Sequence, residues 1–133
     1  MNTQYTMDSI KIEGSPKTPT VEFDNEAGVL AIKGRSIPEN SIDFYKQLID
    51  WIDEYALQPK EETVLHMQLE YFNTSSSKCI LDVFKKLENI KKAGKVVRVK
   101  WHYEEDDEDM LEAGEDYDAI IDLDFEMIKE AEF

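Results

Sequence analysis

The chain has 133 residues, of which 41% are hydrophobic and 11% aromatic, a composition typical of one folded domain rather than of a disordered chain. We therefore expect a single domain over residues 1–133. Thirty acidic residues against 15 basic ones give a net charge of −15, which excludes nucleic acid and anionic membranes as favoured partners, because both would repel the chain.

The negative charge is concentrated near the end of the chain. Residues 101–133 hold 15 acidic residues and one basic residue. A single cysteine, Cys79, excludes an internal disulfide, and no apolar run reaches the roughly 18 residues of a membrane span. The first residues lack the basic start and apolar run of a signal peptide, so we expect a cytoplasmic protein without membrane insertion.

The first elements in chain order are a loose arm and two strands. Residues 1–17 are polar and are expected to form the arm. The segments "TVEFD" (20–24) and "GVLAIKG" (28–34) alternate apolar and polar residues, which predicts strands joined by a hairpin loop at 25–28.

A helix is predicted next, with Pro38 and Glu39 in its first turn and Pro59 beyond its end. Apolar residues recur on one face of this helix, at Tyr45, Leu48, Ile49, Ile52 and Tyr55. We interpret that face as core, and an exposed partner-binding edge is the alternative.

Two further strand–helix pairs and a last strand follow. Residues 63–72 and 95–103 alternate as strands, and the first has Leu65, Met67, Leu69 and Tyr71 on its apolar side. Helices are predicted at 75–93 and near 107–117, and an edge strand at 125–129. The order β-β-α-β-α-β-α-β predicts an α/β fold in two layers, a mixed sheet of about five strands with helices on one face.

Motifs for metal, nucleotide or hydrolytic chemistry are absent from the sequence. His66 and His102 fall on the polar sides of separate strands, and we interpret them as independent surface residues rather than metal ligands. The acidic run at 104–109 lacks the spacing of a calcium-binding loop and is interpreted as a solvated loop, with protein docking as the alternative. Glycine-rich phosphate loops and a serine nucleophile elbow do not occur, so we expect neither a cofactor nor enzyme activity.

The segment "YFNTSSSK" (71–78) lies where a strand ends and a helix begins. Asn73 or Thr74 can cap the helix, and capping alone is one interpretation. A phosphoacceptor is another, because a phosphate at a helix N-terminus meets exposed N–H groups and the positive end of the dipole. Two further alternatives remain. The segment could bind a small anion or a nucleotide, or Thr74 or Ser75 could be a catalytic nucleophile.

Together with "GRSIPEN" (34–40) and "VKWHYEEDDEDMLEAGED" (99–116), this segment resembles the SiaC family of bacterial regulatory phosphoproteins over about residues 18–125. The resemblance implies a fold like the STAS domain of anti-anti-sigma factors. It also implies that Thr74 is phosphorylated by a dedicated Ser/Thr kinase and dephosphorylated by a PP2C-type phosphatase. The unphosphorylated form would bind and activate a diguanylate cyclase, which raises cyclic di-GMP and promotes aggregation or biofilm.

The surface around Thr74 is expected to bind these three partners in turn. Its predicted residues are Asn73, Thr74, Ser75, Ser76, Arg35, Pro38, Glu39 and Asn40. The usual STAS phosphosite has Asp where this chain has Asn73, and a Gly that is absent here. A role as an anti-anti-sigma factor is therefore the less favoured alternative.

Overall fold

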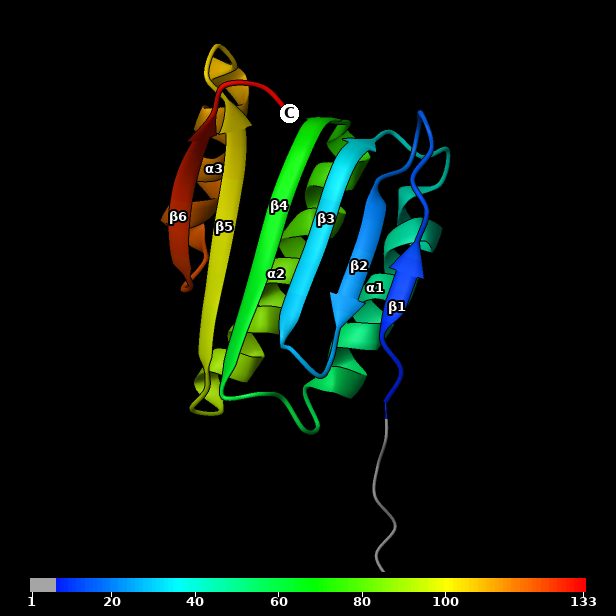
Figure 1. Ribbon diagram of the computed structural model, residues 1–133, viewed down its shortest axis with the longest axis vertical. Coiled ribbons are helices and arrows are strands. Elements are labelled where there is room, and N and C mark those ends of the chain that lie inside the picture. Colours follow the sequence, from blue (N-terminus) through cyan, green and yellow to red (C-terminus); the bar gives the residue numbers. More distant parts are fainter. Residues whose placement is uncertain (1–6) are drawn as a thin grey trace, which may run out of the picture.

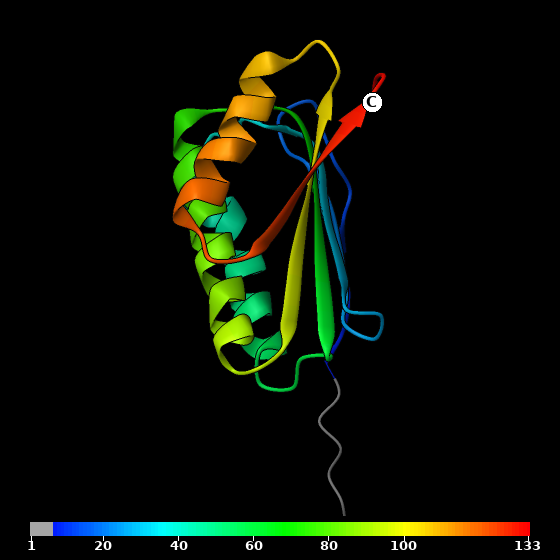
Figure 2. The same cartoon turned by 90° about the vertical axis from the view of Figure 1, so that its left-hand side faces the viewer.

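The computed structural model describes residues 7–133, which form a six-stranded sheet covered on one face by three helices (Figures 1 and 2). In chain order the elements are β1 (Ile10–Ile12), β2 (Thr20–Asp24), β3 (Val29–Ser36), α1 (Ser41–Tyr55), β4 (Glu62–Phe72), α2 (Thr74–Lys92), β5 (Val96–Glu104), α3 (Glu108–Ile120) and β6 (Asp124–Glu130). None of the helices in this part of the chain is long and apolar enough to cross a membrane.

The strands lie side by side in chain order, from β1 at one edge to β6 at the other. The pairs β1–β2 and β2–β3 are antiparallel, and the pairs from β3 to β6 are parallel. Each parallel step passes through one helix, and the helices share one face because such crossovers have a single hand. The predicted two-layer α/β fold is confirmed, and its sheet has six strands rather than about five.

The additional strand, β1, comes from the segment that was expected to be a loose arm. Ile10 pairs with Phe23 and Ile12 with Val21. The indole Nε1 of Trp51 donates a hydrogen bond to the backbone oxygen of Asp8 (2.9 Å), just before this strand. A three-residue strand shows too little alternation to be recognised from sequence, and its neighbours hold it in place. Residues 1–6 of the expected arm lie outside the described residues.

The first helix begins later than predicted. Asn40 has an extended backbone, and its side-chain oxygen accepts a hydrogen bond from the backbone N–H of Asp43 (3.1 Å). An amide side chain in this position ends the preceding loop and starts the helix. Pro38 and Glu39 therefore lie in the loop before α1 and not in its first turn.

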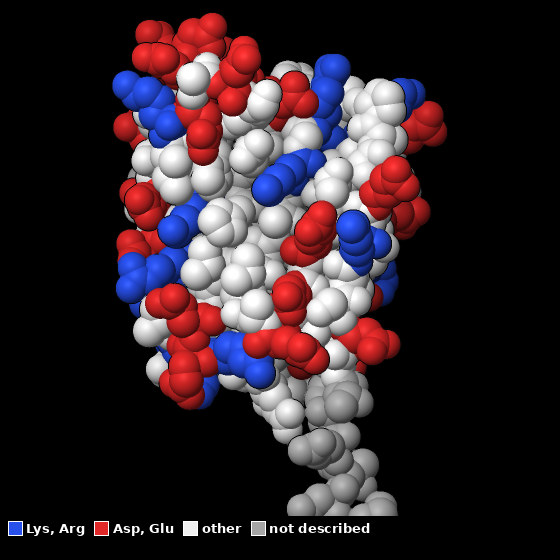
Figure 3. All heavy atoms as spheres, in the orientation of Figure 1, with Lys and Arg blue, Asp and Glu red and all other residues white. Residues whose placement is uncertain are grey.

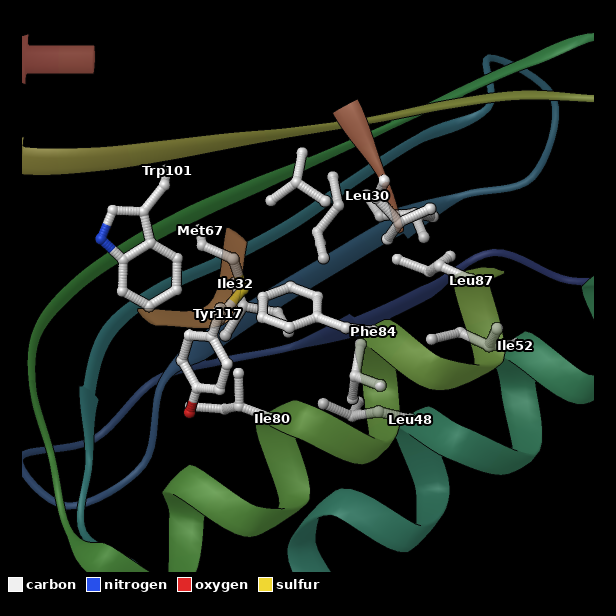
Figure 4. Close-up of a cluster of buried hydrophobic side chains, with 14 of the residues drawn as sticks. Leu30, Ile32, Leu48, Ile52, Met67, Ile80, Phe84, Leu87, Trp101 and Tyr117 are labelled. Atoms are coloured by element: carbon white, nitrogen blue, oxygen red, sulfur yellow. The ribbon is translucent and has the colours of Figure 1, made fainter. Parts of the chain in front are cut away.

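The core fixes α2 and α3 against the sheet through aromatic side chains (Figure 4). The ring of Trp101 on β5 lies 6.4 Å from the ring of Phe84 on α2 and 5.5 Å from that of Tyr117 on α3. Its indole N–H donates to the backbone oxygen of Met110 (2.9 Å). Trp101 thus holds α3 both by ring packing and by a hydrogen bond. The predicted core face of α1 is also confirmed, since Tyr45, Leu48, Ile52 and Tyr55 are buried and Ile49 is partly buried against the core.

The end of β4 differs from simple alternation. Leu69 pairs with Gly34 and Tyr71 with Arg35, so Glu70 is an extra residue that forms a bulge. The bulge turns Tyr71 away from the core, and its side chain is 52% exposed. The prediction that Tyr71 lies on the apolar side is therefore wrong. Phe72 takes the inward position, and its ring lies 6.3 Å from that of Trp101.

Candidate functional site

The segment 73–77 contains the start of α2 and follows directly on the C-terminal end of β4, an inner strand of the sheet (Figure 1). Asn73 has an extended backbone, and its side-chain oxygen accepts a hydrogen bond from the backbone N–H of Ser76 (2.9 Å). Asn73 is therefore the cap, and Thr74 is the first residue of the helix. This settles which of the two predicted capping residues takes that role.

Ser76 is buried and ties α2 to the end of β3. Its hydroxyl donates to the backbone oxygen of Ser36 (3.0 Å) and accepts from the Ser36 hydroxyl (2.9 Å). The Ser36 hydroxyl is also 2.7 Å from the hydroxyl of Tyr45, whose pKa is raised by burial. Ser76 is thus a structural residue, because none of its atoms is available to a partner without opening this network.

Ser75 is exposed but already hydrogen-bonded. Its hydroxyl lies 2.8 Å from that of Ser41 at the start of α1, and it donates to the side-chain oxygen of Asn73 (3.2 Å). The backbone N–H of Asn73 also donates to the backbone oxygen of Ser36 (3.0 Å). These bonds join the start of α2 to the end of β3 and the start of α1, the two ends of the 37–40 loop, so the two predicted parts of the surface are neighbours.

Thr74 is exposed, and its hydroxyl has no hydrogen-bond partner in residues 7–133. In this it differs from Ser75 and Ser76, whose hydroxyls are both hydrogen-bonded. Ser77 is half-buried, and its backbone oxygen accepts a bond from the Tyr117 hydroxyl (2.8 Å). Of the hydroxyls in "TSSS", that of Thr74 is therefore the most accessible to a modifying enzyme.

The charge around Thr74 suits an added anion. The first turn of α2 contains no acidic residue, whereas α1 has Asp43 there and α3 has Glu108 and Asp109. No carboxylate of its own first turn therefore compensates the positive end of the α2 dipole. Lys78 is exposed and follows Thr74 by one helical turn, on the same side of the helix.

The predicted residues in the loop before α1 have different exposures. Glu39 and Asn40 are exposed, whereas Pro38 is buried and shapes the loop. Arg35 is exposed and pairs with Tyr71, so both lie on the sheet face that no helix covers. The sequence analysis placed Arg35 in the expected site. In the structure, the alternation along β3 points its side chain away from the helical layer.

The structure also brings together two residues that we expected to be independent. His66 Nδ1 lies 3.1 Å from His102 Nε2, and His102 Nδ1 lies 2.9 Å from a carboxylate oxygen of Glu130. Burial, followed by His102, Lys100 and Lys33, lowers the pKa of His66. Among the described residues, no group of three or more His, Cys, Asp or Glu side chains is arranged to hold a metal ion. A clue was present in the sequence, since both histidines alternate with core residues on strands adjacent in the predicted order.

The comparison with known proteins agrees with the fold. Residues 12–130 match the family described as SiaC family regulatory phosphoprotein. A protein of Pseudomonas aeruginosa (strain UCBPP-PA14) is 34% identical over 111 residues, which cover 84% of this chain and 88% of that protein.

Solved structures show the same similarity. SiaC of Pseudomonas aeruginosa has a TM-score of 0.86 and 31% identity, with 93% of this chain and 100% of that chain covered. The structure of the diguanylate cyclase SiaD in complex with its activator SiaC, from the same organism, matches with a TM-score of 0.86 and 31% identity over 91% of this chain and 99% of the other. The chain belongs to the SiaC family of regulatory phosphoproteins.

Proposed function

We propose that this protein is a non-enzymatic switch in the cytoplasm, and that phosphorylation of Thr74 determines which partner it binds. A dedicated Ser/Thr kinase adds the phosphate, and a PP2C-type phosphatase removes it. The unphosphorylated form binds and activates a diguanylate cyclase. The relative SiaC, which is an activator of the cyclase SiaD and is bound to it in a solved structure, supports the assignment of this partner.

The observation that supports Thr74 most directly is its contrast with its neighbours. Ser75 and Ser76 have hydrogen-bond partners, and Ser76 is also buried, whereas Thr74 is exposed with a hydroxyl that has none in residues 7–133. A kinase can reach this oxygen without breaking any bond of the fold.

The chemistry of the switch follows from the position of Thr74. A phosphate adds a charge of about −1.5 to −2 next to the free N–H groups of the first turn. Lys78, one turn further along, supplies a cation on the same side of α2. The Asn73 cap and the Ser76 bonds keep the helix start in place. Phosphorylation therefore changes the charge and shape that a partner meets while the helix stays folded.

The test combines mass spectrometry with a cyclase assay. Protein isolated from its native cell should gain one phosphate on the peptide that contains Thr74, and Thr74→Ala should lose it. Ser75→Ala is the matched control and should keep the phosphate. With cyclase and kinase present, Thr74→Ala should maintain cyclic di-GMP synthesis, and Thr74→Glu should weaken cyclase binding by about tenfold or more, equivalent to about 1.4 kcal/mol.

Two results would contradict the proposal. One is a phosphate that maps to another residue, or none under any growth condition. The other is cyclase activation that is the same for Thr74→Ala and Thr74→Glu. A hydrolytic burst with an activated ester, abolished by Thr74→Ala, would instead support the alternative of a nucleophile.

A further inference from the structure

One side of the sheet is not covered by a helix. Figure 2 shows that, within residues 7–133, the three helices all lie on the other side. The strands from β3 to β6 are parallel, and parallel sheets usually have both faces covered. The uncovered side, which we call the open face, therefore lacks a layer that such sheets commonly have.

Aliphatic side chains form the middle of the open face. Val29 on β3 pairs with Val64 on β4, and Ala31 follows Val29 on the same side of β3. Val96 on β5 lies diagonally from Val64, because Val64 pairs with Arg98. Figure 3 shows uncharged side chains in the middle of this face, in the lower part of the molecule, with charged side chains of both signs on either side. Val29 is 39% exposed and Val96 47%, so covering them would remove apolar surface from water.

The charges on the open face follow the order of the strands. The strand register aligns residues of neighbouring strands in rows across the sheet. From β1 to β6, one row is Lys11, Glu22, Ala31, His66, Lys100 and Glu126. From β2 to β6, the next row is Asp24, Val29, Val64, Arg98 and Asp124. Strands at equal distances from the boundary between β3 and β4 thus carry opposite charges, acidic β2 against basic β5 and basic β1 against acidic β6.

We propose that the open face binds the open face of a second copy of this chain. The two-fold axis lies between the two sheets, parallel to the strands, over the boundary between β3 and β4. Sheets packed face to face keep their strands within about 30° of each other, as this axis requires. Glu22 of one copy then lies opposite Lys100 of the other, and Asp24 opposite Arg98. The aliphatic side chains of both copies meet at the axis, so the face is complementary to itself.

Other symmetric arrangements of the two faces bring like charges together. An axis over β4 would place β2 opposite β6, so that Glu22 would face Glu126. An axis across the strands would place each strand opposite itself, and acidic β6 would face acidic β6. Complementary charges therefore select one register, as they do at other interfaces.

The overall charge and the ion pairs within one copy are compatible with this contact. Ten of the 30 acidic residues lie in 104–118, at the end of β5 and on α3 in the helical layer, and salt screens their repulsion across the sheet. Arg98 has ion pairs with Glu62 and Asp124 in its own chain (both 3.2 Å), and a carboxylate of the other copy would join this network. Both helical layers face outward in such a pair, so Thr74 stays exposed on each copy.

Sedimentation equilibrium of the full chain over a range of concentrations measures the association. We expect monomers and dimers without larger species, because a two-fold contact closes on itself. Glu22→Lys should weaken dimerisation by about tenfold or more, since it creates two contacts between like charges in every pair. It also changes the net charge from −15 to −13, because one acidic residue is lost and one basic residue is gained, and this alone would favour association. Glu115→Lys on α3 makes the same change of net charge and, as the matched control, should not weaken dimerisation.

A mixture of two variants tests the contact directly. Lys100→Glu alone should also weaken dimerisation. An equimolar mixture of the Glu22→Lys and Lys100→Glu proteins should dimerise about as well as the original protein, because both contacts of the mixed pair join an acidic and a basic side chain. Thermal unfolding shows whether each variant is folded. A mixture of folded variants that stays monomeric overturns the inference, and so does an original protein that is monomeric at every concentration up to about 1 mM. Dimers that neither substitution weakens would use another surface and would also overturn it.

Discussion

Gly114 is the position at which a single methyl group should test the packing of α3. A Cβ atom added there would lie 2.5 Å from Cδ1 and 2.6 Å from Nε1 of the Trp101 ring. The ring is 1% exposed and is surrounded by Phe72, Phe84 and Tyr117, so it has no space into which to move. Gly114→Ala must therefore push α3 away from β5, and this stretches the bond from Trp101 to the Met110 backbone (2.9 Å).

The size of the effect follows from three terms. Replacing Gly by Ala inside a helix stabilises it by about 1 kcal/mol. Overpacking of a core costs about 1–3 kcal/mol, and leaving a buried donor unpaired costs about 1–3 kcal/mol more. We therefore expect Gly114→Ala to lower the free energy of unfolding by about 1–5 kcal/mol, opposite in sign to the helix propensity.

Urea unfolding followed by circular dichroism measures this change, and the dependence on urea concentration should stay constant. Glu112, at an exposed position in the interior of the same helix, is the control for propensity alone, and Glu112→Gly should be about 1 kcal/mol less stable than Glu112→Ala. A Gly114→Ala protein that is as stable as the original, or more so, would refute the argument.

Two more predictions concern the helix cap and the histidine pair. Asn73→Ala removes the hydrogen bond to the Ser76 N–H and should lower the free energy of unfolding by about 1 kcal/mol. Asn73→Asp should keep this hydrogen bond and the stability. Urea unfolding of both variants measures the difference. The pKa of His66 is lowered in the folded protein, so the unfolded chain binds the proton more readily and stability should fall as the pH decreases through about 6.5. As the pH is lowered from about 7.5 to 5.5, the melting temperature of His66→Gln should fall less than that of the original protein. An equal fall in both proteins would contradict the assignment of this pH dependence to His66.

Much of the fold could be predicted from local periodicity. The alternation in β2, β4 and β5 and the apolar stripes of α1 and α2 predicted these elements to within a few residues of their bounds. Periods of two and about 3.6 residues record which side of an element is buried, and this information is local. The order of elements then predicted parallel pairing with helices on one face, because only such crossovers connect consecutive strands of this kind.

The parts that could not be predicted depend on pairing between distant segments. β1 exists because Ile10 and Ile12 find partners on β2. The bulge at Glu70 depends on the register between β3 and β4, and it reverses the side on which Tyr71 lies. The contact between His66 and His102 depends on the register between β4 and β5.

For the candidate site, the sequence by itself determined that a strand ends and a helix starts at "NTSSS", and that this segment resembles that of a phosphoprotein family. Only the tertiary structure distinguished the hydroxyls from one another. Ser76 is occupied because Ser36 comes from β3, and Ser75 because Ser41 comes from α1. Thr74 stays exposed because, within residues 7–133, no element packs over the outer side of the first turn of α2. Ser36 and Ser41 lie more than 30 positions before their partners Ser76 and Ser75 in the chain, and only folding brings these hydroxyls together.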